Sequence, residues 1–269
     1  MQKYFEVTGG SDLLTKAFLQ VLQNVCISLN SRVKFFIQPS KGVTLCYKKD
    51  QHLFHKDADV VLVTTTGKAA LFMDFNPPLS IQKMEALRAF HYDTSTKITL
   101  IFRQRFWEKD GIRGGKSIRE RPTCFIYYPS HSFPGNYTIS VILASYTWFD
   151  DSLLFLGASD EELKELHLRD LSKIHGMVIN SLCPCVLVKK WSLDTYSLGA
   201  FALFTPYQHL EYAQELFRPE VRIHFAGEHT AFPHAWIEMA MKSAIRAAVN
   251  INNEIYLSDT KEKMSSKLT

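Results

Sequence analysis

One segment near the end of the chain constrains its fold more than any other. Residues 221–250 read as a strand, then the loop GEHTAFPH, then a long helix that begins near Trp236. Small residues at helical spacing, such as Ala240 and Ala247, let this helix pack closely on a sheet. Gly227 lets the backbone approach a ligand, and the unpaired amides of a first helical turn favour partial negative charge. This pattern is typical either of one end of a cofactor site or of a plain strand–turn–helix with a buried tryptophan.

Composition places the chain among ordinary globular proteins. It has 269 residues, 46% hydrophobic and 22% charged, which suits one large domain or two medium ones. Its 31 Lys and Arg residues are spread among 27 Asp and Glu residues, so no basic face for nucleic acid is expected. No apolar run approaches the length of a membrane span, and the N-terminus has no secretory signal pattern. Asn136 starts an Asn-Tyr-Thr glycosylation acceptor, which favours a secretory route.

The glycines exclude two phosphate-binding motifs within this sequence. Only 12 residues are Gly, and no two of them have G-x-G spacing. The sequence therefore contains neither a dinucleotide-binding fingerprint nor a P-loop.

Periodicity and turn residues predict an α/β chain with a strand-rich middle. Ser11 is expected to cap a helix that ends near Gln23, and Ser159 with Glu162 forms a predicted capping box for a helix that Gly176 ends. Further helices are predicted at 81–90 and 236–250, strands at 33–37, 42–48, 60–64, 96–103, 124–128, 138–148, 186–191 and 222–225, and a loop at 111–115.

Several blocks of sequence resemble one family. FAGEHTAFPHAWIEMAMKSAIRAA is similar to the C-terminal flavin-binding motif of the amine oxidase superfamily. EVTGGSDLL, LVTTTGKAALFMDFNPPL, HYDTSTKI, FWEKDGIRGGKS, FIYYPSHSF and KKWSLDTYSLGAFALFTPYQ follow in the order of the fish and snake-venom L-amino acid oxidases, over residues 4–252. The resemblance implies an FAD enzyme that oxidises an L-amino acid with oxygen, giving a 2-oxo acid, ammonia and hydrogen peroxide.

The resemblance also implies which residues contact FAD. Val33 matches a strand residue whose backbone contacts the adenine, and Glu228, after Gly227, matches the acid near the ribityl–pyrophosphate stretch. Lys97 matches the catalytic lysine that reaches the flavin N5 through a water, although its context alone indicates a surface lysine. Trp191 is either a neighbour of the cofactor or a core residue. The segment that borders the flavin is Ala235, Trp236, Ile237, Glu238, Met239 and Ala240.

For the substrate, the resemblance implies four positions. Tyr146, or Ser145 if the register differs by one, matches the residue at the substrate carboxylate. Phe201 matches a hydrophobic wall, and Ala235 and Trp236 lie around the amino group. Family members often carry Gly in place of Ala235, whose methyl group would narrow the pocket. These walls favour large hydrophobic or aromatic amino acids.

Two other features of the sequence raise the question of a metal site and of a disulfide. His224, His229 and His234 have the spacing of a metal cluster, but strand geometry places His224 apart and the family uses no metal there, so no metal is expected. The resemblance also implies a disulfide at Cys183, but its partner position holds Phe102, so that disulfide is expected to be missing.

The resemblance implies a discontinuous domain organisation. A Rossmann-type FAD-binding domain at 1–90 and 201–257 is interleaved with a substrate-binding domain of mixed sheet and helices at 91–200, before a flexible tail at 258–269. The G-x-G-x-x-G unit of the family is absent, so the sequence resembles the C-terminal half of an oxidase. Two hypotheses remain: part of an active flavoenzyme, or a catalytically silent fragment or binding module. The implied partners are an L-amino acid and oxygen, with a homodimer left open, in a secreted, lysosomal or granule location.

Overall fold

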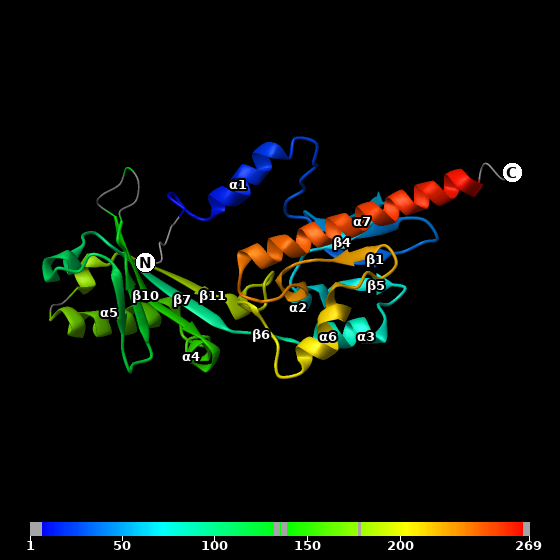
Figure 1. Ribbon diagram of the computed structural model, residues 1–269. Coiled ribbons are helices and arrows are strands. Elements are labelled where there is room, and N and C mark those ends of the chain that lie inside the picture. The colour runs from blue at the N-terminus through cyan, green and yellow to red at the C-terminus, as the bar shows by residue number, and fades with distance from the viewer. Residues whose placement is uncertain (1–6, 132–134, 136–138, 177–178, 266–269) are drawn as a thin grey trace, which may run out of the picture. The chain divides into compact units, whose positions relative to one another are not determined.

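The computed structural model describes residues 7–131, 135, 139–176 and 179–265, and these form two compact units. One unit contains Ser95–Lys190 and the N-terminal segment up to Ser28, and the other contains Leu29–Thr94 and the chain from Trp191 onward. Helices and several small sheets occur together, as the predicted α/β class requires (Figure 1). The glycosylation acceptor at Asn136 lies outside the described residues.

An antiparallel sheet of five strands, in the order β11-β7-β10-β9-β8, forms the first unit. Along β7, Ile98, Leu100 and Phe102 alternate with less buried residues, as in a strand with one face in the core. Leu168 and Leu171 of helix α5 pack with Leu100 and Phe102 on that face. The elements are β7 (Ser95–Phe102), η1 (Phe106–Asp110), β8 (Gly115–Ile118), β9 (Phe125–Tyr128), β10 (Ser140–Trp148), α4 (Phe149–Leu153), α5 (Asp160–His175), η2 (Asn180–Leu182) and β11 (Cys185–Lys190).

Helix α5 begins and ends at the residues that the sequence predicts. The amide of Glu162 donates to Ser159 Oγ at 3.3 Å, and the amide of Ser159 donates to Glu162 Oε2 at 2.8 Å, which completes the capping box. Gly176 follows the helix with φ +62°, the left-handed conformation that ends many helices.

Helix α1 (Asp12–Val21) ends close to its predicted position and Ser11 is its N-cap residue as predicted, but the expected side-chain capping bond is missing. A capping bond needs extended backbone angles at the cap residue, whereas Ser11 already has helical angles (φ −68°, ψ −19°) in the turn after Gly10. None of the residues of α1 is buried, so its apolar residues, including Leu14 and Phe18, lie exposed.

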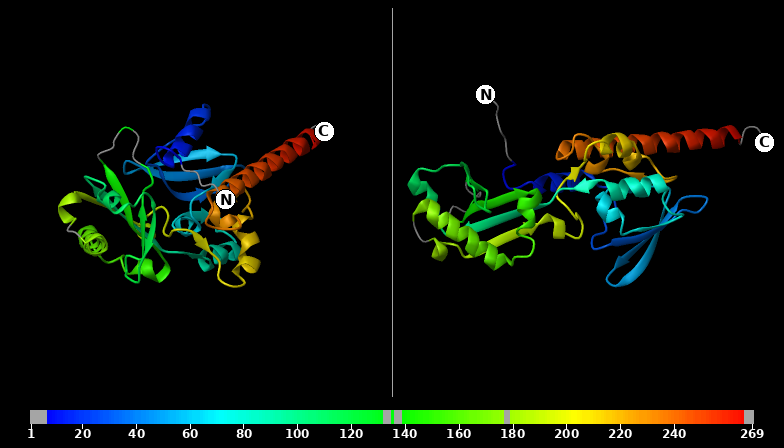
Figure 2. Two further views of the ribbon diagram at one scale, coloured as in Figure 1. Left: turned by 60° about the vertical axis from the view of Figure 1, so that its left-hand side comes forward. Right: turned by 90° about the horizontal axis from the view of Figure 1, so that it is seen from below.

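Three small sheets form the second unit. Strand β1 pairs with β2 in antiparallel and with β5 in parallel, and β13 pairs in parallel with β4. The β2–β3 hairpin reaches out from this unit as a long blue ribbon (Figure 2). The strands are β1 (Arg32–Ile37), β2 (Val43–Lys49), β3 (His52–Ala58), β4 (Val61–Val63), β5 (Asp74–Asn76), β6 (His91–Tyr92), β12 (Ala202–Leu203) and β13 (Ile223–Phe225). The helices are α2 (Gly67–Ala70), α3 (Ile81–Ala89), η3 (Trp191–Leu193), α6 (Gln208–Phe217), η4 (Glu228–Thr230) and α7 (Ile237–Ser265).

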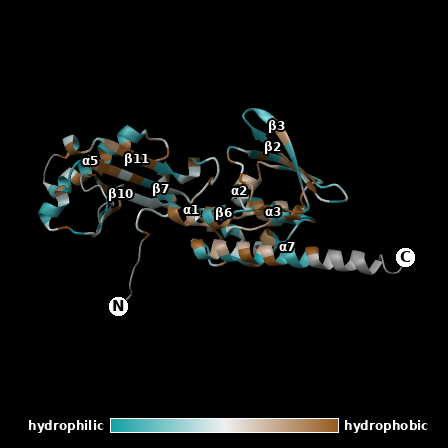
Figure 3. Cartoon of the chain, turned by 90° about the horizontal axis from the view of Figure 1, so that it is seen from above, coloured by the Kyte–Doolittle hydropathy of each residue, from teal (hydrophilic) through white to brown (hydrophobic). Residues whose placement is uncertain are grey.

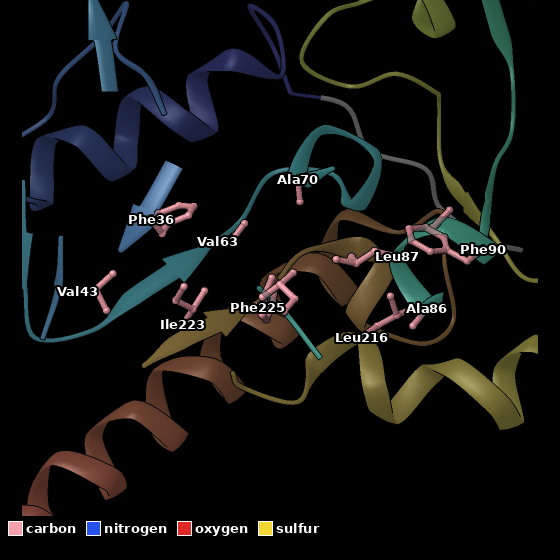
Figure 4. Packing of buried hydrophobic residues seen from close by; sticks show 12 residues of the cluster. Phe36, Val43, Val63, Ala70, Ala86, Leu87, Phe90, Leu216, Ile223 and Phe225 are labelled. Carbon is pink, nitrogen blue, oxygen red and sulfur yellow. The ribbon is translucent and has the colours of Figure 1, made fainter. Parts of the chain in front are cut away.

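The core of the second unit lies where strands β4 and β13 meet helices α3 and α6. Val63 comes from β4, Ile223 and Phe225 from β13, Leu87 from α3 and Leu216 from α6 (Figure 4). All five side chains are buried in one cluster, so segments far apart in the sequence depend on one another for their packing. This cluster supports the loop that follows β13.

Helix α7 runs past its predicted end near residue 250, because no Gly or Pro occurs between its first residue and Ser265. One face is buried through Ser243 and Ala247. Hydrophobic and hydrophilic residues alternate along the coloured part of the helix (Figure 3). The exposed apolar residues at helical spacing, which we call the outer stripe, are Ile237, Met241, Ile245 and Val249. Among the described residues, no helix combines the length and the apolar character needed to cross a bilayer.

Candidate functional site

The loop after strand β13 is anchored on helix α7. Gly227 adopts φ +127°, a conformation that disfavours residues with a Cβ, and a Cβ there would meet the His229 ring at 3.3 Å. The amide of Gly227 donates to Ser243 Oγ of α7 at 2.9 Å. Arg246, one turn further along α7, donates to Thr230 Oγ1 at 3.0 Å. The loop therefore has a fixed backbone on which the side chain of Glu228 is mounted.

The carboxylate of Glu228 is half-buried and bonded to backbone amides on two sides. Oε2 accepts from the amide of Ala202 at 2.8 Å, and Oε1 accepts from the amide of Ala235 at 2.7 Å. Burial raises the pKa of Glu228, and these two hydrogen bonds act in the opposite direction. Each oxygen keeps a second lone pair, so the carboxylate can still accept a hydroxyl of a ligand.

The predicted flavin-bordering segment forms the turn before α7 and its first turn. Ala235 has φ +67°, unusual for a residue with a Cβ. The amides of Met239 and Ala240 both donate to the carbonyl of Trp236, so the amides that precede them lie at the open end of the helix. Trp236 and Ile237 are 64% and 70% exposed, which leaves this helix end accessible. Such an end favours a partner with partial negative charge.

Val33 lines a cavity of about 210 Å³ in the same unit. Phe72 and Tyr196 contribute apolar walls. Thr65 also lines the cavity, and its buried Oγ1 has no hydrogen-bond partner among the described residues. The carbonyl oxygen of the preceding Thr64 lies 3.8 Å from the position that a Cβ on Gly227 would take. A flat ligand with a hydrogen-bonding edge suits the apolar walls of this cavity and the unpartnered Oγ1 of Thr65.

Lys97 and Tyr146 lie opposite each other on strands β7 and β10 of the first unit. The Lys97 ammonium nitrogen is 4.5 Å from the centre of the Tyr146 ring, a cation–π contact. The Trp148 ring, two residues along β10, is 4.3 Å from that of Tyr146. A bulge between Leu143 and Ser145 sets this register, and Ser145 is buried. Of the two alternatives for the substrate position, Tyr146 is therefore the residue beside Lys97.

Two further predicted residues have ordinary structural contacts. Phe201 is half-buried, and its carbonyl accepts from the amide of Asp93 at 2.9 Å. Trp191 opens the short helix η3, and its carbonyl accepts from the amide of Asp194. A pocket role for Phe201 and a cofactor role for Trp191 stay predictions.

The three histidines of the alternative metal hypothesis lie in different surroundings. His224 is buried with its Nε2 3.4 Å from the Glu254 carboxylate. The ring of His229 stacks on Phe90, and the ring of His234 lies 4.6 Å from that of Phe204. Cys183 is a free, buried thiol, and Phe102 lies in the core of the first unit.

Sequence patterns do not single out two residues that the structure places at this site. Thr65 is one of three consecutive threonines, and only its buried oxygen distinguishes it. Ser243 belongs to the row of small residues on α7, where it is indistinguishable from a packing residue until its bond to Gly227 is seen. A polar residue within a stripe of alanines is the one signal that could have indicated Ser243.

The fold and the loop–helix geometry define a class of protein. Residues 2–252 match the model of the family described as flavin containing amine oxidoreductase, and the chain belongs to that family. A putrescine oxidase variant has a similar fold, with a TM-score of 0.78 at 17% identity, covering 91% of this chain and 53% of that one. A cyclohexylamine oxidase from Brevibacterium oxydans gives a TM-score of 0.66 at 16% identity, covering 83% and 48%. The predicted mixed α/β class is confirmed.

Among sequence relatives, an L-amino-acid oxidase from Siganus canaliculatus is 66% identical over 259 residues, which cover 96% of this chain and 49% of that protein. An L-amino-acid oxidase from Demansia vestigiata is 41% identical over 254 residues, covering 93% and 48%. The chain thus spans about half the length of these relatives. The predicted resemblance to L-amino acid oxidases is confirmed.

Proposed function

We propose that the chain forms the C-terminal half of an FAD-dependent L-amino acid oxidase. The reaction converts an L-amino acid, water and oxygen into a 2-oxo acid, ammonia and hydrogen peroxide. The observation that carries the proposal is the Lys97–Tyr146 pair, which places an ammonium group beside a phenol on adjacent strands, at the positions that the family resemblance assigns to catalysis and substrate binding. The relatives named L-amino-acid oxidase support the substrate class.

The residues of the second unit fit part of a flavin dinucleotide. The Val33 cavity, with the orphan Thr65 oxygen, would hold the adenine end. Glu228 would accept from hydroxyls of the ribityl chain, and the open end of α7 after Ala235 would face the ring carbonyl oxygens. When bound, FAD supplies the hydride acceptor for the substrate α-carbon and returns the electrons to oxygen.

The remaining residues position the reactants. The phenol of Tyr146 would donate to the substrate carboxylate, and Phe201 and Trp236 would wall its side chain, which favours large hydrophobic or aromatic amino acids. The ammonium group of Lys97 would order a water and stabilise the negative charge that develops as oxygen is reduced. We propose that the chain contributes two flavin-binding segments, 1–90 and 201–257, and a substrate-binding domain at 91–200 between them. We further propose that the protein is secreted or lies in lysosomes or granules. Two copies of it would form a homodimer.

A chimera tests the proposal. This chain replaces the corresponding half of the Siganus canaliculatus oxidase, and peroxide formation is measured with L-phenylalanine, with D-phenylalanine as the control substrate. We expect flavin to be bound and peroxide to form with the L-isomer only. A soluble chimera that binds flavin but oxidises no L-amino acid would contradict the proposed function and support the silent-fragment hypothesis.

Within that chimera, Lys97→Met should slow turnover while flavin stays bound. The ammonium group contributes to the reaction with oxygen but makes few contacts that anchor the cofactor. Stopped-flow reoxidation of the reduced enzyme measures this step directly, and Lys189→Met, which removes the lysine opposite Lys97 on β11, is the matched control. An unchanged reoxidation rate in the Lys97 variant would refute its role.

A further inference from the structure

The carboxylate of Glu228 connects two segments that are 33 residues apart in the chain, Ala202 and Ala235. Ala202 follows Phe201 directly, and Ala235 precedes Trp236. These neighbours are the two walls of the substrate pocket under the proposed function. A single side chain therefore sets the distance between the backbones that carry both walls.

The side chain is well placed to hold this distance. Its own backbone is fixed by the bonds from Gly227 to Ser243 and from Arg246 to Thr230. Within the described part of the chain, no lysine or arginine forms an ion pair with Glu228, so its charge is directed at the two amides. Hydrogen bonds from amides to a carboxylate are stronger than bonds between neutral groups.

The backbone conformation of Ala235 is a second observation that points to a positioning role for Glu228. The Ala235 backbone is left-handed, with φ +67°, which costs free energy for any residue that has a Cβ. The 2.7 Å bond from its amide to Glu228 Oε1 holds the residue in this conformation. Glycine would adopt the same angles without that cost, so a glycine at 235 would depend less on the carboxylate.

We propose that Glu228 is a positioning residue that clamps the Phe201–Ala202 and Ala235–Trp236 segments at a fixed separation and holds Ala235 in its left-handed conformation. This rests on the proposed function for its catalytic meaning, since the two segments are pocket walls only in an oxidase. The clamp itself is a property of the chain and can be measured without cofactor.

Amide hydrogen exchange of the isotope-labelled 269-residue chain tests the clamp. Glu228→Gln replaces one acceptor oxygen by an amide group, which cannot accept from a backbone amide. Because the glutamine keeps one acceptor oxygen, we expect at least one of the Ala202 and Ala235 amides to exchange roughly tenfold faster or more. The Ala226 amide, which donates to Val63, serves as the internal reference and should not change. Glu238→Gln is the matched control, because Glu238 is exposed and pairs only with Lys242 among the described residues.

A rescue experiment separates positioning from general stabilisation. The indole N–H signal of Trp236, assigned with Trp236→Phe, should shift in Glu228→Gln and return towards the wild-type position in Glu228→Gln/Ala235→Gly. If Glu228→Gln does not fold, a pH titration of the wild-type chain replaces it, and the Ala202 and Ala235 amide shifts should follow one common midpoint. Unchanged exchange, no rescue, or two separate midpoints would each overturn the clamp. These results do not depend on oxidase activity, so a silent chimera would refute the proposed function and leave the clamp standing.

Discussion

The imidazole of His229 is buried beside other cationic groups. Burial, with smaller contributions from the charges of Lys83, His234 and Arg246, lowers the pKa of His229 to about 3. Below about pH 6.5 the unfolded chain binds a proton that the folded chain does not, so the free energy of unfolding falls as pH drops from 6.5 towards 3.

This linkage predicts the effect of His229→Tyr, which removes the buried imidazole. Tyrosine does not titrate in this range, so the variant should lose a slope of up to about 1.4 kcal/mol per pH unit between pH 6 and roughly 4. Urea unfolding at several pH values measures the difference from wild type. Equal slopes in the two proteins would show that His229 is protonated in the folded state.

The sequence predicts the role of an individual residue when the pattern that indicates this role lies within a few neighbouring residues. The capping box of Ser159 and Glu162 and the stop at Gly176 each require only a few neighbouring residues, and the structure has all three in place. The partners of Glu228 are backbone amides of Ala202 and Ala235, and a backbone amide has no sequence signature. Contacts of this kind become visible only in the folded chain.

Among the elements, helix α6 ends on a buried lysine from α3. The ammonium group of Lys83 donates to the carbonyls of Glu215 and Arg218, the latter at 2.6 Å, and it lies 4.5 Å from the Phe225 ring. Burial lowers the pKa of Lys83 to about 8. The lysine satisfies carbonyls that the end of a helix leaves open.

Lys83→Met should therefore destabilise the chain by about 2–4 kcal/mol, since the carbonyls of Glu215 and Arg218 lose their hydrogen bonds to a fully buried ammonium group. Lys68→Met is the control: Lys68 caps the carbonyl of Arg88 from a half-buried position, where water can replace it, so its loss should cost under about 1 kcal/mol. Denaturant unfolding of both variants provides the comparison. Equal losses would show that burial of Lys83 does not set its contribution.

The sequence does not predict helices that lack a capping residue or strands that lack alternation of apolar and polar residues. Helix α6 has Tyr207 at its N-cap with φ +70° and no cap bond, so nothing in the sequence marks its start. Strand β3 is exposed at six of its seven residues and exists because it pairs with β2. The register that places Tyr146 beside Lys97 depends on a bulge in β10 that the sequence does not reveal.

For the whole molecule, we expect the 269-residue chain, purified alone, not to retain FAD. The residues present suit the adenine, the ribityl chain and the ring, but the sequence has no G-x-G loop for the two phosphate charges. Loss of about three charge-assisted hydrogen bonds, at roughly 1.5–3 kcal/mol each, weakens binding by several orders of magnitude. Gel filtration after incubation with FAD, followed by an absorbance scan, is the measurement. A yellow monomer with stoichiometric flavin would contradict this expectation.

The residues that evolution accepts along the outer stripe of α7 depend on whether this face of the helix contacts water or another protein. Its inner face accepts only small residues, since Ser243 and Ala247 are buried, whatever else the chain meets. At Met241 and Ile245 the chain itself imposes no such restriction, because both are exposed. If related sequences carry charged residues at the positions of the outer stripe, this face of the helix is exposed to solvent in the functional protein. Variation restricted to apolar residues would mean selection by a second protein surface.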